Sequence, residues 1–368
     1  MQVARQCTAL IVAAVALGAC RATPPKPLTL GMAYPPWARG FITVAESTMA
    51  EEWPDSLPRP RILLDTDLMP ERVERTVEWT QELLRDPSVR VIVGPSASHT
   101  ALATAPLVNA AAIPMIVPSA TARQLAQAGP WVFRMAGNDS AEGAFLVHQV
   151  LRRPRLRRVL ILFTNDAYGQ GLRAGLAEEL SRTGLRPTSE IPVDRQSDFE
   201  TLFRSEFRAR RPDVIIAAIR NPELAAAARA LRTLDSRIPV FVGDGAYGPL
   251  VFYEQLGDTR FPVFGAALWL PDPDDSVARA YVARFRRILG RPPRPEDAMI
   301  HDALMLAATA LHEGHGDPHA IRRWLLALGV SRPPYQGVTG PIDFRVGRER
   351  AFRLGRFVHD SGVDAEIR

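Results

Sequence analysis

The chain has 368 residues, of which 46% are hydrophobic and 7% aromatic, so it is long enough to form two domains with apolar cores. Its 45 basic side chains are interleaved with 40 acidic ones and leave a formal charge of only +5. The densest basic run, residues 152–158, is a short linker without a DNA-binding motif or a basic helix face, so the sequence argues against a nucleic-acid partner.

The N-terminus has the pattern of an export signal. Residues 7–20, CTALIVAAVALGAC, are apolar and uncharged and too few to span a bilayer comfortably. Their end, LGAC, resembles a bacterial lipobox, in which the cysteine is lipid-modified and begins the mature chain; an ordinary signal peptide with a coincidental cysteine is the alternative. We therefore expect a lipoprotein signal peptide at 1–19, lipidation of Cys20, a tether at 20–27, and export to the periplasm or cell surface with a lipid anchor in the membrane.

From residue 28 onward, short apolar runs alternate with amphipathic stretches, a pattern typical of βα units around a parallel sheet. The predicted strands are 28–33, 61–66, 90–94, 113–117, 158–163, 213–219, 239–243 and 264–270. Helices are predicted between them. One opens at Pro70, because proline followed by an acid suits the first helical turn, and ends near Leu84.

The stretch from Trp131 to Ser140 has no regular pattern and divides the strands into two sets. Each set can form its own sheet, which predicts an α/β protein with two lobes. The second set is followed by predicted helices at about 275–289, 297–313 and 318–328, a strand at 340–344, and a final strand pair ending near Val358.

The segment 163–175, FTNDAYGQGLRAG, contains a GxGxxA spacing that dinucleotide-binding turns also show. Such a turn needs its first glycine directly after the strand, yet five residues separate Phe163 from Gly169. Glu190, an acid at about the distance expected for a ribose contact, precedes only a weak strand signal, IPV. The segment therefore argues against a nucleotide, and we expect no cofactor.

Five segments, one of which overlaps 163–175, occur in order along the chain: VIVGPSASHTALATAPLVNAAAIPMIVPSATA (91–122), VFRMAGNDSAEG (132–143), LFTNDAYGQGL (162–172), FVGDGAYG (241–248) and PYQGVTGPIDF (334–344). Together they resemble the type I periplasmic binding proteins, above all the leucine/isoleucine/valine-binding receptors of ABC transporters. The resemblance implies two Rossmann-like lobes, each a parallel sheet flanked by helices, joined by a three-strand hinge and closing on a small ligand like a Venus flytrap. It implies the following limits: lobe 1 at 28–136 and 265–341, lobe 2 at 137–264 and 342–368, and hinge crossings near 135–138, 263–266 and 340–343.

The resemblance also implies which residues of lobe 1 hold the ligand. In the family, the serine at the position of Ser98 donates to a ligand α-carboxylate at a helix N-terminus, a chemistry that the helix dipole favours. The residues matching Ser119, through its backbone, and Thr121, through its hydroxyl, hold the ligand ammonium and carboxylate. A plain helix N-cap is the alternative role for Ser98 and for Thr121.

In lobe 2 the resemblance implies a negative pole and a closing side chain. Asp244 matches the acid that pairs with the α-ammonium, with a tight Asp-Gly turn as the alternative. Tyr168 matches the tyrosine that reaches the ligand as the cleft closes, with a surface tyrosine as the alternative; the glycines after it keep the turn and the first helical turn slim. We accordingly interpret 163–175 as a cleft-closing loop.

Two departures from the family bear on the ligand. The loop 32–40 is shorter than the family's usual loop after its first strand, so Tyr34 and Trp37 are both candidates for the pocket wall. Arg220 stands where the branched-chain receptors have an aromatic ligand contact. If Arg220 faces the cleft, it favours a second acidic group on the ligand, because a guanidinium pairs well with carboxylates; if it faces solvent, nothing follows.

Other kinds of site are not favoured. His312, His315 and His319 lie in LHEGHGDPH, but the glycines and Pro318 break the helix that would align them, so we expect no metal site. Ser98 lacks the Gly-x-Ser-x-Gly turn of a nucleophile, so we expect no enzyme.

The expected function is that of an exported lipoprotein. It captures an amino acid of the branched-chain kind, or a related small zwitterion or amide, by hinge closure and presents it to an ABC permease; we expect a monomer. The alternative is a lipoprotein outside transport that uses the same fold for sensing or interaction, as some cell-wall synthase regulators do. The full set of zwitterion contacts favours the receptor.

Overall fold

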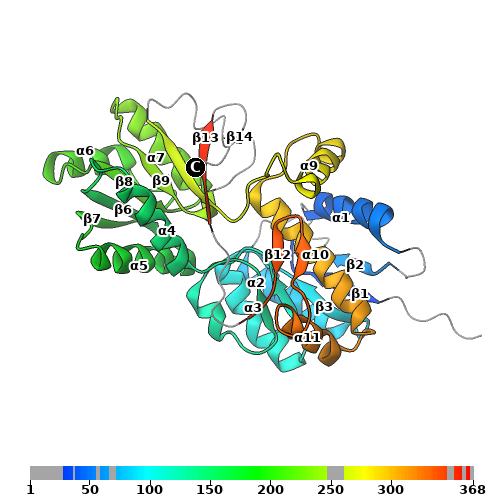
Figure 1. Ribbon diagram of the computed structural model, residues 1–368. Helices are drawn as coiled ribbons and strands as arrows, with labels where there is room; N and C mark the ends of the chain where they lie inside the picture. Colours follow the sequence, from blue (N-terminus) through cyan, green and yellow to red (C-terminus); the bar gives the residue numbers. More distant parts are fainter. Residues whose placement is uncertain are drawn as a thin grey trace, which may run out of the picture.

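The computed structural model describes residues 28–35, 38–54, 59–65, 72–246, 261–345, 352–358 and 362–364. The predicted signal peptide, Cys20, the tether and Trp37 lie outside these ranges. Within them the helices and strands form two lobes that lie side by side (Figure 1), each built around its own sheet. None of the described helices is long and apolar enough to cross a bilayer.

The first lobe contains a five-stranded parallel sheet with the order β2-β1-β3-β4-β5. Its strands are β1 (Thr29–Met32), β2 (Arg61–Leu64), β3 (Val89–Val93), β4 (Met115–Val117) and β5 (Val132–Arg134). The helices of this lobe are α1 (Arg39–Glu52), α2 (Val73–Arg85), α3 (Ser98–Ala111), α9 (Ser276–Leu289), α10 (Pro295–Glu313) and α11 (Pro318–Ala327), with the short η2 (Arg123–Gln127). Helices α10 and α11 return late in the sequence and pack on β3.

The second lobe contains a seven-stranded sheet with the order β14-β13-β10-β9-β8-β6-β7. Its strands are β6 (Val159–Thr164), β7 (Ser189–Val193), β8 (Val214–Ala218), β9 (Val240–Val242), β10 (Val263–Ala267), β13 (Arg353–Val358) and β14 (Gly362–Asp364). Strands β6 to β10 are parallel, whereas β13 and β14 add to the edge in antiparallel fashion. The helices are α4 (Asp139–Leu151), α5 (Ala167–Arg182), α6 (Phe199–Ala209) and α7 (Asn221–Thr233), with η3 (Asp244–Ala246) after β9.

The central strands β1, β6 and β8 are buried along their whole length. Their sequences are therefore continuous apolar runs rather than alternating ones, as expected for a parallel sheet covered by helices on both faces. The predicted α/β fold with two lobes is confirmed.

Several predicted elements differ in detail. Strand β5 lies inside the stretch that we expected to be irregular, because three residues are too few to show a period. Strand β7 forms despite its weak signal; Pro192 is tolerated there because β7 is at the edge of the sheet, where a missing N–H breaks no inner ladder. Arg72 is extended and α2 begins at Val73; Pro70, where we predicted the start of this helix, lies outside the described residues. The final strand pair ends at Asp364 rather than near Val358.

The described elements change lobe three times along the chain: between β5 and α4, between β10 and α9, and between β12 (Gly340–Ile342) and β13, where residues 346–351 lie outside the described ranges. Strand β12 first forms a small antiparallel pair with β11 (Tyr335–Gly337) in the first lobe. The crossings predicted near 135–138, 263–266 and 340–343 and the residue limits predicted for the lobes stay predictions.

Glycines allow α4 and α5 to approach each other closely. A Cβ on Gly175 would lie 2.4 Å from the carbonyl oxygen of Asp139, and a Cβ on Gly143 would lie 2.6 Å from the carbonyl carbon of Gly175. Because neither residue has a side chain, the two helix backbones are in contact. This packing places the N-terminal turn of α4 beside Gly171 and Gly175 of α5.

Candidate functional site

A cavity of about 270 Å³ lies between the lobes, near the lower limit of small-molecule sites. Its lining comes from the segments that follow β3, β4, β6, β8, β9 and β10, together with the first turn of α10. The lining residues are Ser96, Ala97, Ser98, Ser119, Ala120, Thr121, Tyr168, Arg220, Asn221, Pro222, Asp244, Gly245, Leu268, Pro295 and Glu296. Carboxyl ends of parallel strands from two sheets therefore meet at one site, as open α/β sheets favour.

Hydroxyl groups line the cavity on the side of the first lobe. Ser98 is the first residue of α3 and is 3% exposed; its Oγ accepts a hydrogen bond from the backbone N–H of Ala122 at 3.3 Å. This leaves the hydroxyl hydrogen free to donate. Thr121 is 1% exposed, and its carbonyl accepts from the backbone N–H of Asp139 at 2.9 Å.

The N-cap alternatives for these two residues are wrong. The cap position of α3 is Ala97, and that of η2 is Ala122, so neither Ser98 nor Thr121 stands at a cap. Both side chains instead line the cavity, as does Ser119 after β4. Their contacts with a ligand stay a prediction.

Tyr168 lies in the first turn of α5 rather than in a loop, so our interpretation of 163–175 as a loop is wrong. The helix is capped by Asp166, whose Oδ1 accepts from the backbone N–H of Gly169 at 2.8 Å. Glycine's low helix propensity concealed this helix start in the sequence. A Cβ on Gly169 would lie 2.0 Å from the carbonyl oxygen of Thr164, so only glycine lets α5 begin so close to β6.

Tyr168 is 3% exposed and contacts the segment that follows β9. Its hydroxyl oxygen accepts from the backbone N–H of Gly245 at 3.0 Å. A Cβ on Gly243 would lie 2.2 Å from that oxygen, and one on Gly245 would lie 2.8 Å from the ring. The two glycines that flank Asp244 thus make room for the phenol, which fixes the position of Asp244 beside it.

Three carboxyl groups lie together in the second lobe, and one of them, Asp244, lines the cavity. The backbone N–H of Asp244 donates to Oε1 of Glu142 at 2.6 Å, and Glu142 and Asp139, both in the first turn of α4, are 0% exposed. Within the described part of the chain, both oxygens of Asp139, Oε2 of Glu142 and Oδ1 of Asp244 are buried without a hydrogen-bond partner. Asp139 and Glu142 were not among the predicted site residues, although both lie in 132–143, a segment that carries the family resemblance.

Burial shifts the acid–base properties of this carboxyl cluster (Asp139, Glu142 and Asp244). Burial raises the pKa of Asp139 to about 6 and, with the nearby charge of Asp139, that of Asp244 to about 7. Burial and the charges of Asp244 and Asp139 raise the pKa of Glu142 well above its ordinary value. The cluster therefore retains protons near neutral pH in the free protein and would gain from a cation in the cavity.

Arg220 faces the cavity from the cap position of α7. Its Nε and Nη2 donate to Oδ2 of Asp166 at 3.2 and 2.9 Å, and its guanidinium carbon lies 5.0 Å from the centre of the Tyr168 ring. The positive charge of Arg220 is thus already paired by the cap residue of α5. A second acidic group on the ligand is not needed to neutralise it.

The remaining predicted residues have other positions. Tyr34 is 2% exposed and lies behind the cavity, where its hydroxyl is hydrogen-bonded to Oγ of the lining residue Ser96. His312 and His315 have ring centres 6.4 Å apart, whereas His319 packs edge-on against Trp131. Among the described residues, no three His, Cys, Asp or Glu side chains are grouped in a way that could hold a metal ion.

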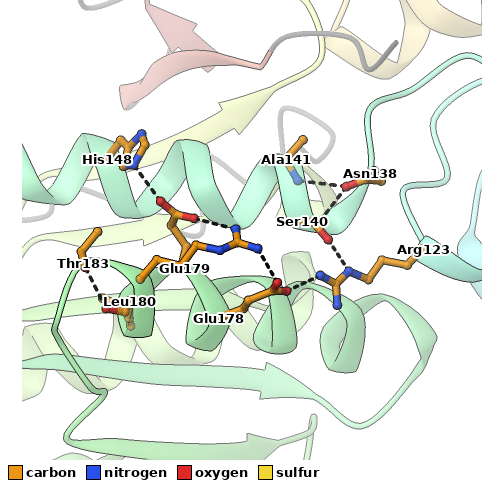
Figure 2. Close-up of polar contacts among 10 residues, drawn as sticks. Arg123, Asn138, Ser140, Ala141, His148, Glu178, Glu179, Leu180 and Thr183 are labelled. Atoms are coloured by element: carbon orange, nitrogen blue, oxygen red, sulfur yellow. Dashed lines mark hydrogen bonds and ion pairs between the residues drawn. The ribbon is translucent and has the colours of Figure 1, made fainter. Parts of the chain in front are cut away.

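A polar network joins the two lobes outside the cavity (Figure 2). Arg123 of η2 contacts Oγ of Ser140 in α4 through Nε and Oε2 of Glu178 in α5 through Nη2, the latter at 2.5 Å. Glu178 also accepts from Arg182, and the next residue, Glu179, contacts His148 of α4 at 2.8 Å. Because Arg123 belongs to the first lobe and its partners to the second, this contact depends on how the lobes are placed.

A protein-family model described as periplasmic binding protein matches residues 71–359. Among curated proteins, the Leu/Ile/Val-binding protein BraC3 of Rhizobium johnstonii is 27% identical over 159 residues, and the Leu/Ile/Val-binding protein homolog 1 of Brucella abortus is 24% identical over 233 residues. The matches cover 43% and 62% of this chain, and 43% and 60% of the two relatives. The chain thus spans about half the length of these curated relatives.

Solved structures resemble almost the whole chain. The leucine binding protein LivK of Thermotoga maritima has a TM-score of 0.80 at 19% identity, with 92% of this chain and 98% of that one covered. LivJ of Streptococcus pneumoniae in complex with isoleucine has a TM-score of 0.79 at 17% identity, with 93% and 99% covered. A solute binding protein of R. palustris in complex with benzoate has a TM-score of 0.77 at 17% identity, with 93% and 95% covered. These similarities establish the fold.

Proposed function

The chain belongs to the periplasmic binding protein family, and from this premise we propose that it is the exported solute receptor of an ABC transporter that captures an amino acid or a related small zwitterion between its lobes. The observation that carries the proposal is the arrangement of polar groups in the cavity. Ser98 and Thr121 offer hydroxyl groups from the first lobe, and Asp244 offers a carboxylate from the second. A zwitterion bound between the lobes would accept hydrogen bonds from the hydroxyl groups with its carboxylate and pair with Asp244 through its ammonium group.

The donors suit a carboxylate for two reasons. Ser98 stands at the N-terminal end of α3, where the helix dipole and free backbone N–H groups favour negative charge. The hydroxyl of Ser98 accepts one hydrogen bond from the backbone, so it retains its own hydrogen for the ligand.

The acceptors suit an ammonium group. Asp244 belongs to a cluster of three carboxyl groups with four buried oxygens that lack a partner among the described residues. Unpaired buried polar atoms are costly, and an ammonium group with three donors offsets that cost. The names of the relatives, which include Leu/Ile/Val-binding proteins, support an amino acid as the solute.

Capture follows from the position of these groups on separate lobes. A solute that bridges Ser98 and Asp244 binds the closed arrangement better than the open one and so shifts the population toward closure. The closed receptor is then the form presented to the permease. We further propose lipidation of Cys20, a periplasmic or cell-surface location, a monomeric state, and the absence of catalysis.

A thermal-shift screen tests the proposal. The mature chain, with Cys20 replaced by serine, is incubated with amino acids, small amides and dicarboxylates. A true ligand at 100 times its dissociation constant adds about 2.7 kcal/mol to the free energy of unfolding. A flat response to the whole panel contradicts the receptor and favours the sensing or interaction lipoprotein.

A further inference from the structure

The cavity contains a second pair of opposite charges that the binding of a zwitterion does not use. Arg220 lines it from the second lobe and Glu296, in the first turn of α10, lines it from the first. No ion pair joins these two side chains in the described part of the chain. Beside Arg220, Oδ1 of Asn221 is buried and has no hydrogen-bond partner among the described residues.

From these groups we infer that the solute carries an uncharged side chain that both donates and accepts hydrogen bonds, a carboxamide or ureido group, which Arg220, Asn221 and Glu296 recognise together. The inference rests on the proposed function, because it assumes that Ser98 and Asp244 hold the amino-acid end. It assigns Glu296 and Asn221 a role in specificity.

Arg220 is suited to a neutral acceptor rather than to a second carboxylate. Its Nε and Nη2 both donate to one oxygen of Asp166, which balances the charge and fixes the guanidinium over the Tyr168 ring. The remaining N–H groups of the guanidinium are left to donate. A carbonyl oxygen accepts them without adding a charge, whereas a carboxylate would compete with Asp166.

Glu296 is suited to accept a hydrogen bond from a donor on the ligand, because the N-terminus of α10 is capped by another residue. The neighbouring Asp297 caps α10: its Oδ2 accepts from the backbone N–H of Arg294 at 2.7 Å, and its side chain forms ion pairs with Arg291 and Arg294. Glu296 takes part in no ion pair among the described residues, and it faces the cavity with a side-chain hydrogen bond to Ser96. A carboxylate has about four acceptor positions, so the contact with Ser96 leaves others to accept from a ligand N–H.

Asn221 adds a second acceptor. A side-chain carboxamide has one acceptor oxygen and two N–H donors, which match the donors of Arg220 and the acceptors of Glu296 and Asn221. A branched aliphatic side chain would instead meet one large aliphatic lining residue, Leu268, and would bury these polar groups unpaired. A binding site discriminates most strongly against a ligand analogue that leaves the buried polar groups of the site unpaired.

Calorimetric titration of the mature chain (Cys20→Ser) tests the inference with L-glutamine, L-asparagine and L-citrulline against three comparison ligands. L-methionine has an apolar side chain of similar length to that of glutamine, L-glutamate replaces the amide with an acid, and L-leucine represents the branched aliphatic solutes. We expect at least one amide or ureido amino acid to bind about 100-fold more tightly than all three.

Each other outcome has a definite meaning. Tighter binding of L-leucine or L-methionine than of the amides overturns the inference and leaves the proposed function intact, and so does tighter binding of L-glutamate. Binding of none of the six amino acids overturns the proposed function and the inference with it.

The variant Glu296→Leu provides a second, independent readout. Because it replaces an acceptor with an aliphatic side chain, it should lower the affinity for the amide ligand at least tenfold and raise that for L-methionine, so the ratio of the two affinities falls. Equal losses for both ligands indicate a structural role and contradict the inference. Asp274→Asn, in an exposed loop before α9, is the control and should change neither affinity.

Discussion

The backbone N–H of Asp244 donates to Oε1 of Glu142 at 2.6 Å, which joins the end of β9 to the first turn of α4. This contact brings together two carboxyl groups that are far apart in the sequence, Asp244 at the cavity and the buried Glu142, with Asp139 close by. Three buried acids in one place are unfavourable when all are ionised. Four consequences of this and the neighbouring contacts can be measured.

The stability of the free protein should fall as the pH rises from about 4 to 7. Burial raises the pKa of Asp139 to about 6 and that of Asp244 to about 7 in the folded state, above the value of about 3.9 for an unfolded chain. The folded state therefore binds more protons than the unfolded state in this window, so the stabilisation present at low pH is lost as the pH rises through the folded pKa values. The loss should amount to a few kcal/mol, measured as the unfolding free energy in urea at each pH. The variant Asp139→Asn should flatten the profile; a profile that rises over this window in the wild type contradicts the buried cluster.

Asp244→Asn should act in opposite directions on affinity and stability. Removing the carboxylate leaves the ligand's ammonium group without its counter-charge, which should weaken binding of any amino acid by roughly 3 to 5 kcal/mol if the pair is buried. It also removes a charge that repels Glu142 and Asp139, so the free protein should be as stable as the wild type or more stable near pH 7.5. Calorimetric titration and urea unfolding on the same sample check both effects. Unchanged affinity would falsify the assignment of Asp244 as the negative pole.

Gly171→Ala should destabilise the second lobe. A Cβ at this position would lie 1.9 Å from Oδ2 and 2.9 Å from Cγ of Asp139, which is 0% exposed, so we expect a loss of about 2 kcal/mol in unfolding free energy. Gly40→Ala in α1 is the matched control. Its Cβ meets only the flexible end of Leu289, at 3.0 Å, and alanine favours a helix over glycine by about 1 kcal/mol. Similar losses for both variants would show that the close approach of α5 to Asp139 is unimportant.

Arg123→Met should have only a small effect on ligand affinity. Arg123 connects the lobes through Ser140 and Glu178, but the pair with Glu178 is exposed and competes with water and with Arg182 (Figure 2). Exposed ion pairs contribute little, so the dissociation constant should rise no more than about fivefold, and the difference from the wild type should shrink further in 1 M salt. A much larger loss of affinity that salt does not reduce would make this contact, rather than the solute, the main stabiliser of the closed state.

Part of the site was predictable from the sequence for a simple geometric reason. Ser98, Tyr168 and Asp244 each follow a predicted strand, and the carboxyl ends of parallel strands share one edge of a sheet. Arg220 was also placed after a strand, but its direction was left open. The structure decides that question, because Asp166 at the start of α5 draws the guanidinium over Tyr168 toward the cavity.

The helix at 167–182 shows where local patterns mislead. Gly169 and Gly171 lower the helix propensity of the segment, so it resembled a loop. Both positions require glycine because of residues outside the helix: Thr164 and Asp139 occupy the space that a Cβ would need. The sequence shows that these positions lack a side chain, but it does not show which neighbouring residue leaves no room for one.

By itself the sequence determined the alternation of strands and helices, the division into two lobes, and the family, because apolar runs and turn residues act over short distances along the chain. Only the tertiary structure decided which acids meet in the cavity. Glu142 and Asp244 are 102 residues apart, and Glu296 reaches the cavity through α10, which belongs to the first lobe although it follows strand β10 of the second. Their contacts depend on the packing of whole helices against distant strands, and that packing has no signature within any single stretch of sequence.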